Sequence, residues 1–214
     1  VDKISSLAGL SYRYNGFNAW VRPFRMPHQT ASIGGMCGGG PECRPGEITL
    51  AHNGVLFLDD AAEFRTSVLQ MLRVPMENGN ITLSRAGRST TYPAKFQLLM
   101  ATNPCPCGNY GSKNKICLCS AKAIDQYWKK FSAPLLDRVA IRFYDDKEHN
   151  LEWTNYTVSE YRGMIKRAWE RRKERGNEGL RIEPDADKLY ERKAAKYNWS
   201  PRTRSLILSV AVTI

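Results

Sequence analysis

The sequence lacks several features that would place it at once in a membrane, secreted or repetitive class. No apolar run approaches the roughly 18 residues that a membrane-spanning helix needs. The first residues, VDKISSLAGL, lack the charged-then-apolar order of a secretory signal. No internal repeat or low-complexity tract is present. These absences predict a cytoplasmic chain without a membrane partner.

The sequence also lacks the phosphate-binding motif G-x-x-x-x-G-K-[ST]. Residues 34–40 are rich in glycine, but no Lys-Ser or Lys-Thr pair follows them. A complete phosphate loop of this kind is therefore excluded within the 214 residues.

The composition is that of a globular protein, with 42% hydrophobic and 25% charged residues, and it is basic, with a net charge of +11. Residues 1–144 hold 17 Lys and Arg against 9 Asp and Glu, and residues 145–214 hold 15 against 12. A basic excess suits nucleic-acid binding. It equally suits a solvated surface with cations for a nucleotide, and charge alone leaves both interpretations open.

Four of the six cysteines form two C-x-C pairs in the pattern C-x-C-x9-C-x-C. Without a secretory signal, such pairs indicate reduced thiols or metal ligands before they indicate disulfides. Four thiols at the two ends of a short loop can bind zinc tetrahedrally, although C-x-C is tighter than the usual C-x-x-C spacing. The alternative is four reduced thiols that merely pack. The candidate zinc ligands are Cys105, Cys107, Cys117 and Cys119.

Two apolar segments that end in polar residues, VLFLDD (55–60) and FQLLMAT (96–102), predict buried strands. Segments with helical or strand-like patterns alternate with them, which predicts an α/β domain. The helical patterns lie at 67–79 and 123–131, a hairpin is predicted at 81–92, and a further strand is predicted at 138–144.

From about residue 150 the pattern is helical throughout. Thr157 and Glu160 fit a capping box, and apolar residues then recur at helical spacing. Ser200 as N-cap with Pro201 at the first helical position opens a last helix. Residues 150–214 are therefore predicted to form a small helical subdomain.

The ends of the two apolar strands carry the side chains that suggest chemistry. Asp59 and Asp60 follow one strand, and Asn103 follows the other. Ligands of open α/β sheets bind at the carboxyl ends of the strands. The first acid could hold magnesium through water, the second could orient or deprotonate an attacking water, and the Asn could position that water against a γ-phosphate. Strands that simply end in solvated polar residues are the alternative.

Two arginines are candidates for phosphate contacts. Arg138, in SAPLLDRVAIRF, could stabilise phosphate charge even in a neighbouring subunit, or could simply pair with Asp137. Arg202 lies in the first turn of the predicted last helix, where a helix N-terminus suits an anion.

An ordered series of motifs resembles the magnesium-chelatase-like AAA+ ATPases of the YifB/ComM competence-protein group. The resemblance is strong over residues 1–142 and looser beyond them. It implies a AAA+ type P-loop NTPase core at residues 1–149, incomplete at its N-terminus, and a helical lid subdomain at residues 150–214, truncated at its end. The motifs are RPFRMPHQTAS, RPGEITLAHNGVLFLDD, LSRAG, YPAKFQLLMATNPCPCG and SAPLLDR.

The resemblance also implies roles for individual residues. Asp59 matches the magnesium-binding acid of the Walker B strand, and Asp60 matches the catalytic acid that follows it. Asn103 matches sensor 1, Arg138 matches the arginine finger, and Arg202 matches the sensor 2 arginine of the lid. The predicted hairpin matches an insertion that often faces the central pore of the ring.

The sequence departs from the family pattern at several positions. The catalytic acid is usually Glu, and Asp60 is one methylene shorter; Ala140 and Val212 stand where Asp and Arg are usual. In the family the phosphate loop lies upstream of the matched region. We therefore expect the chain to be a fragment that does not hydrolyse ATP by itself.

The expected function is that of a motor component. The resemblance implies ATP and Mg²⁺ as cofactors, a homo-hexamer, and ATP-driven remodelling of DNA such as helicase action or branch migration in competence. One alternative is the ATPase subunit of a magnesium-chelatase-type complex, which drives insertion of magnesium into a porphyrin. A further alternative is a non-hydrolysing, zinc-containing interaction or DNA-binding module.

Overall fold

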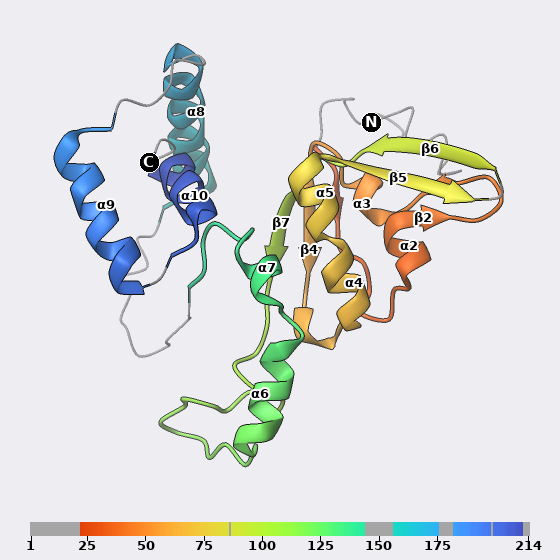
Figure 1. Cartoon of the computed structure of the whole chain (residues 1–214), viewed down its shortest axis with the longest axis horizontal. Coiled ribbons are helices and arrows are strands. Elements are labelled where there is room, and N and C mark those ends of the chain that lie inside the picture. Colours follow the sequence, from red (N-terminus) through yellow and green to blue (C-terminus); the bar gives the residue numbers. More distant parts are fainter. Residues whose placement is uncertain (1–21, 86, 144–155, 176–181, 198, 212–214) are drawn as a thin grey trace. The chain divides into compact units, whose positions relative to one another are not determined.

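A three-stranded parallel sheet forms the centre of the first part of the chain (Figure 1). Its order is β1 (Phe24–Arg25), β4 (Val55–Leu58) and β7 (Gln97–Met100), so the two predicted apolar strands are neighbours. With helices flanking this sheet, the predicted α/β class is confirmed. The computed structural model describes residues 22–85, 87–143, 156–175, 182–197 and 199–211.

The central strand β4 is buried more completely on one face than on the other. Leu56 and Leu58 are fully buried, whereas Val55 and Phe57 alternate with them and stay half-buried. A strand in a parallel sheet is often covered on both faces; here the covering is complete on one face only. The buried core against that strand includes Met36, Ile48, Phe64, Val68, Leu69 and Leu72.

The predicted helix at 67–79 forms as two short helices, α4 (Thr66–Met71) and α5 (Arg73–Asn78), that meet at Leu72. Pro75 is in the first turn of α5, where its missing N–H would lack an intrahelical partner in any case. Gly79 ends α5 in a left-handed conformation with φ of 66°, and its N–H donates to the Pro75 carbonyl at 2.9 Å.

The predicted hairpin is present as β5 (Asn80–Arg85) and β6 (Arg88–Pro93), paired antiparallel. Exposed hydroxyl groups face each other across it, since Thr82 and Thr91 lie 2.9 Å apart at their oxygens. On the other face, the buried Tyr92 hydroxyl donates to the Cys43 carbonyl at 2.9 Å and so fixes the hairpin to the core. The remaining elements of this part are β2 (Gly38–Gly39), α2 (Ile33–Cys37), β3 (Arg44–Pro45), α3 (Glu47–Leu50) and the 3-10 turn η1 (Ala61–Glu63).

Two helices follow the sheet, and a predicted strand after them does not form. Helix α6 (Ala121–Lys129) is capped by the Ser120 hydroxyl, and α7 (Ala133–Leu136) follows it. The strand predicted at 138–144 is wrong for the described residues 138–143, which are irregular. Phe143 is 89% exposed. An apolar strand-like sequence needs a neighbouring strand to pair its backbone groups, and this segment joins none of the described sheets.

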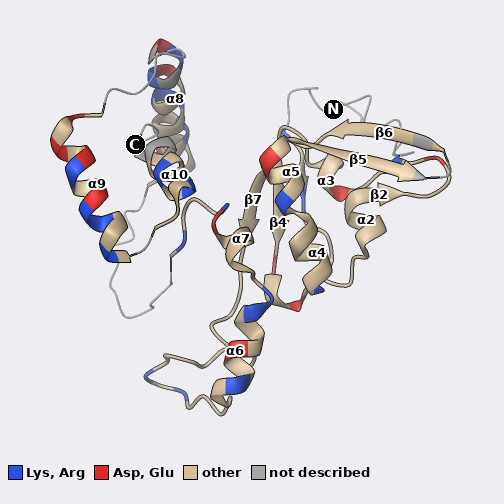
Figure 2. Cartoon of the chain, viewed as in Figure 1, with Lys and Arg blue, Asp and Glu red and all other residues tan. Residues whose placement is uncertain are grey.

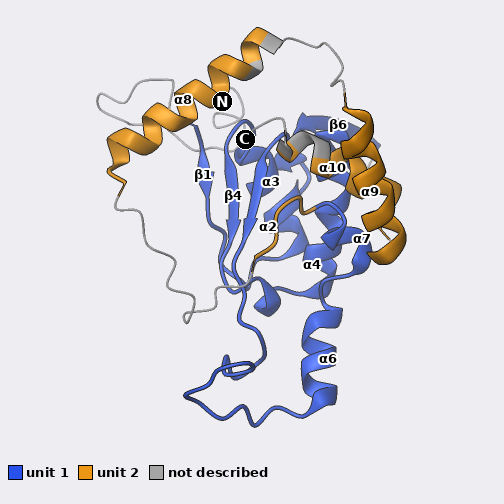
Figure 3. Cartoon of the chain, turned by 90° about the vertical axis from the view of Figure 1, so that its left-hand side faces the viewer, with its two compact units in different colours: residues 1–138 blue, residues 139–214 orange. Residues whose placement is uncertain are grey.

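The chain separates into two compact units, residues 1–138 and residues 139–214 (Figure 3). The boundary predicted at 149–150 lies outside the described residues. The described part of the second unit consists of helices α8 (Val158–Arg175), α9 (Pro184–Tyr197) and α10 (Pro201–Ala211). The predicted capping box is confirmed, because the Thr157 N–H donates to the Glu160 carboxylate at 2.6 Å. No helix in the described part of the chain combines the length and apolar character that crossing a membrane requires.

Candidate functional site

The two acids and the asparagine lie together at the carboxyl edge of the parallel sheet. Leu58 at the end of β4 is opposite Met100 at the end of β7, so both strands stop at the same edge. The pairing continues past the strands: the Ala101 N–H donates to the Leu58 carbonyl at 3.0 Å, and the Ala61 N–H donates to the Ala101 carbonyl at 2.8 Å. This ladder brings the residues that follow each strand side by side.

Asp60 and Asn103 are in direct contact. The Asn103 amide Nδ2 donates to Asp60 Oδ1 at 3.3 Å, and the Asp60 N–H donates to Asp59 Oδ1 at 3.1 Å. All three side chains are exposed to solvent. A polar edge with two carboxylates and an amide can therefore receive a hydrated cation and a water molecule.

Asp60 adopts a left-handed backbone conformation, with φ of 46° and ψ of 50°. Short polar residues tolerate this region better than other non-glycine residues. The turn directs the chain from β4 into η1 and reorients Asp60 relative to Asp59. No sequence pattern predicted this conformation.

Helix α6 contacts the residues that follow β7 through two hydrogen bonds. The Thr102 hydroxyl lies 3.0 Å from the Tyr127 hydroxyl, and the Trp128 indole N–H donates to the Pro104 carbonyl at 3.0 Å. Burial raises the pKa of Tyr127 above its usual value, so its hydroxyl stays protonated at neutral pH. The sequence did not single out Tyr127 and Trp128, whose only signal was their place in the helical pattern predicted at 123–131.

Arg138 does not join the acids. Its guanidinium contacts the Glu77 carboxylate and the Pro134 carbonyl, and its side chain is only 12% exposed. Its ion-pair partner among the described residues is thus Glu77 on α5, and not the adjacent Asp137. Arg202 lies in the first turn of α10, which belongs to the other unit, so the first unit alone does not include it.

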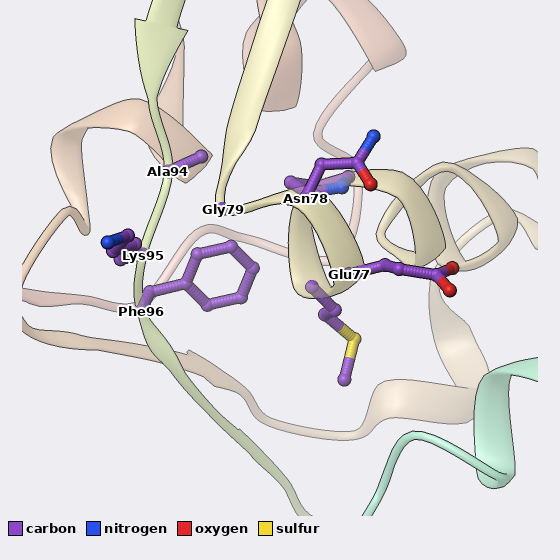
Figure 4. A pocket seen from close by; sticks show the side chains of 8 residues that line it. Glu77, Asn78, Gly79, Ala94, Lys95 and Phe96 are labelled. Carbon is purple, nitrogen blue, oxygen red and sulfur yellow. The ribbon is translucent and has the colours of Figure 1, made fainter. Parts of the chain in front are cut away.

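A shallow depression of about 300 Å³ lies at the opposite edge of the sheet (Figure 4). It lies between the end of α5 and residues 94–96, which lead into β7. In Figure 4, Phe96 points toward α5, whereas the Glu77 carboxylate points away from Phe96. Because these residues precede β7, the depression is separate from the polar residues that follow the strand.

The four predicted zinc ligands gather at one point in the loop between β7 and α6. All four sulfur atoms lie within 4.8 Å of one another. The Sγ atom of Cys105 is 3.4 Å from that of Cys107 and 3.7 Å from that of Cys117. Cys37 and Cys43 belong to a different part of the unit.

Their surroundings affect the thiols unequally. Burial of the Cys105 thiol favours its neutral form, but hydrogen bonds from Cys107, the Tyr110 N–H and Cys117 outweigh burial and lower the pKa of Cys105 to about 6. No donor of this kind reaches Cys37 from the part of the chain that the structure describes, and burial raises the pKa of Cys37 to about 11. Thiolate character is therefore favoured at Cys105 but not throughout the loop. A backbone hydrogen bond at Cys119 favours the thiolate of Cys117, but burial and the neighbouring thiols Cys107 and Cys105 outweigh it and raise the pKa of Cys117 to about 12.

Comparison with known proteins relates this chain to a described family. A model of the family described as "Magnesium chelatase, subunit ChlI" matches residues 1–152. A protein named YifB from Escherichia coli (strain K12) is 51% identical over 118 residues, which are 55% of this chain and 23% of that protein. Competence protein ComM from Haemophilus influenzae is 46% identical over 136 residues, 63% of this chain and 26% of that protein. The chain spans about a quarter of the length of these curated relatives.

Proposed function

The chain belongs to the family described as magnesium chelatase, subunit ChlI, and from this premise we propose that it supplies the hydrolytic edge of an ATP-driven AAA+ motor. One observation carries the proposal: Asn103 donates to Asp60 at 3.3 Å beside Asp59, at the carboxyl edge of two paired parallel strands. In this fold class that edge is where nucleotides and their metal ions bind.

The residues at the edge fit magnesium. Carboxylate oxygens are the hard ligands that Mg²⁺ prefers, and exposed carboxylates can bind it through its water shell. Asp59 is the residue that would hold the ion, which would neutralise negative charge on the phosphates. Asp60 would accept a proton from an attacking water or orient it, and Asn103 would fix the orientation of the Asp60 carboxylate.

The proposed activity requires a phosphate cradle in addition to this edge. The 214 residues contain no G-x-x-x-x-G-K-[ST] motif. We therefore assign hydrolysis to a longer protein that combines this chain with a phosphate loop. Arg138 and Arg202 are proposed as the arginine finger and the sensor 2 residue of that protein, which we place in the cytoplasm as a homo-hexamer.

Turnover of ATP by the natural protein that contains this chain tests the proposal. We expect Asp60→Asn to lower the turnover number by about 100-fold, as for loss of a general base. Asn103→Ala should lower it by about tenfold or more, because a misplaced water reacts slowly. Asp125→Asn, which removes an exposed carboxylate of α6 paired with Lys129, is the matched control and should leave turnover unchanged. Unchanged turnover in Asp60→Asn would overturn the assignment.

DNA is the substrate class that we propose for the motor. The relative from Haemophilus influenzae is named a competence protein. The sequence of helix α8 carries seven Lys and Arg against three Glu, whereas that of α9 carries both signs in nearly equal number. Figure 2 shows blue and red segments together along α9. Binding through such cations releases counterions from DNA, so affinity must fall as salt rises. A DNA affinity that is independent of salt would contradict a DNA substrate.

A chelatase-type role is the second candidate, because the family description itself names a magnesium chelatase subunit. In that role ATP hydrolysis would support insertion of magnesium into a porphyrin by a partner enzyme. Stimulation of turnover distinguishes the two candidates. DNA should raise ATP turnover of a DNA motor, and a porphyrin-binding partner should raise that of a chelatase subunit. If the longer protein has no phosphate loop, and neither DNA nor a porphyrin-binding partner gives measurable ATP turnover, the non-hydrolysing interaction module is favoured.

A further inference from the structure

We propose that the loop between β7 and α6 is a mononuclear zinc site that holds the segment behind Asn103 in place. Its ligands are Cys105, Cys107, Cys117 and Cys119. Zinc binding itself does not depend on the proposed hydrolysis, and it is tested separately.

The sulfur positions match the geometry of a single tetrahedral ion. With zinc–sulfur bonds of about 2.3 Å, neighbouring sulfurs of a tetrahedral site lie about 3.8 Å apart. The observed separations are 3.4 Å for Cys105–Cys107, 3.7 Å for Cys105–Cys117 and 3.6 Å for Cys107–Cys117. Four reduced thiols are weak hydrogen-bonding groups and gain little by converging on one point.

The donor set selects the class of metal. Four soft thiolates in a tetrahedral arrangement favour zinc or an iron–sulfur cluster over magnesium or calcium. A polynuclear cluster places several iron and sulfide atoms between its cysteines and therefore spreads them apart. The short separations observed leave room for one ion at the centre, which favours a mononuclear site over a cluster, and we assign that ion as zinc.

The backbone after Cys105 forms a tight turn that directs an N–H group at the Cys105 sulfur. The Tyr110 N–H donates to the Cys105 sulfur at 3.3 Å, and the Gly108 N–H donates to the Cys105 carbonyl at 3.0 Å. Gly108 has φ of 76°, a conformation that glycine adopts without strain. Amide donors to ligating sulfurs orient the ligands and stabilise their negative charge.

The loop has few other means of staying ordered. Ile116 and Leu118, which flank Cys117, are 82% and 89% exposed, so they provide no apolar core. A metal that links distant cysteines can replace such a core, because its binding free energy also stabilises the folded loop.

The site is connected at both ends to the polar edge of the sheet. A Cβ atom on Gly108 would lie 3.8 Å from Asn103 Oδ1, so the turn lies next to the asparagine side chain with space for little more than a methyl group between them. At the other end, Cys119 precedes Ser120, whose hydroxyl accepts the Ala123 N–H and caps α6. Zinc would therefore fix Asn103 from one side, while α6 fixes Thr102 from the other. This second step rests on the proposed function, whereas zinc content does not.

Elemental analysis of the chain, purified without added metal, tests the site. We expect about one zinc per chain, with a loss of most of it in Cys117→Ser. Cys37→Ser is the matched control, because Cys37 lies in α2 and outside the cluster, and it should retain zinc. Less than about a tenth of an equivalent in the unaltered chain, or equal zinc in both variants, would overturn the proposal. Stoichiometric iron in place of zinc would also overturn it.

Two further measurements keep the proposal testable if Cys117→Ser fails to fold. Cobalt exchanged into the unaltered chain should give the visible ligand-field bands of a tetrahedral thiolate site. Removal of zinc by a chelator should speed amide exchange in residues 104–119 and leave strand β5 protected. Failure of cobalt to show tetrahedral bands, or unchanged exchange in the loop, would contradict a metal that holds the loop.

Discussion

At the scale of single residues, Asp60 combines a reactive side chain with a strained backbone. Its φ of 46° is in the left-handed region, which costs a non-glycine residue about 1 kcal/mol or more. Asp is among the residues that tolerate it best. The short acid therefore fits the backbone that holds it, although the family resemblance leads one to expect the longer Glu.

The substitution Asp60→Glu distinguishes the effect of side-chain length on catalysis from the effect of the left-handed backbone on stability. In the natural protein that contains the chain, we expect the longer carboxylate to raise ATP turnover, because it approaches the attacking water more closely. We also expect a loss of about 1 kcal/mol in the free energy of unfolding, because Glu tolerates the left-handed region less well. Steady-state kinetics and denaturant unfolding measure the two effects. If turnover does not rise, the short acid is not what limits hydrolysis.

The contacts of the site differ in how far the sequence predicts them. The contact of Asp60 with Asn103 is predictable, because parallel neighbouring strands must end at one edge. The pairing of Arg138 with Glu77 is not, since 61 positions separate them and only the tertiary fold of the first unit brings them together. The left-handed turn at Asp60 is also not predictable from the sequence, because Asp is common in every kind of turn.

At the scale of elements, local capping signals predicted helix ends well. The Glu160 carboxylate accepts the Thr157 N–H at 2.6 Å, and the Thr157 hydroxyl oxygen accepts the Glu160 N–H at 3.3 Å, as the capping-box pattern predicted. Gly79 likewise ends α5, whereas the Ser120 cap of α6 was not predicted, because the helical pattern was placed at 123–131. These signals depend on neighbouring residues only. The failed strand at 138–143 depended on a distant partner strand, which no local pattern reports.

The capping box of α8 makes a prediction about pH. Backbone and side-chain hydrogen bonds from Thr157 lower the pKa of Glu160 in the folded chain. A lowered folded pKa means that the cap stabilises α8 above the unfolded pKa of Glu and is lost as pH falls through the folded pKa. Nuclear magnetic resonance titration should therefore give a lower pKa for Glu160 in the unaltered chain than in Thr157→Ala.

A matched variant distinguishes the charge of the cap from its hydrogen bonds. Glu160→Gln keeps an oxygen acceptor for the Thr157 N–H but does not titrate. The helicity of α8 in this variant should not change across the acidic range in which the unaltered chain loses it. Identical Glu160 titration with and without the Thr157 hydroxyl would contradict a contribution of that hydroxyl to the lowered pKa of Glu160.

At the scale of the whole molecule, the first unit supplies one part of the proposed nucleotide site, and the sequence lacks another. The carboxyl edge of its sheet supplies Asp59, Asp60 and Asn103, while the sequence contains no phosphate-loop motif. Phosphates gain most of their binding free energy from backbone N–H groups and a lysine in such a loop. Two carboxylates without that cradle would repel the phosphates in the absence of a metal ion.

Calorimetric titration of the chain with MgATP measures whether the carboxylates bind a nucleotide without a phosphate loop. We expect no binding in the micromolar range, since the edge would contact the nucleotide only through a hydrated Mg²⁺ ion. Asp59→Asn should then change nothing measurable, because there is no affinity to lose. A micromolar dissociation constant that Asp59→Asn weakens would mean that these 214 residues hold the phosphates by another route. In that case the glycine-rich residues 34–40 would be the first place to search for the donors, because their successive N–H groups are the type that can bind an anion.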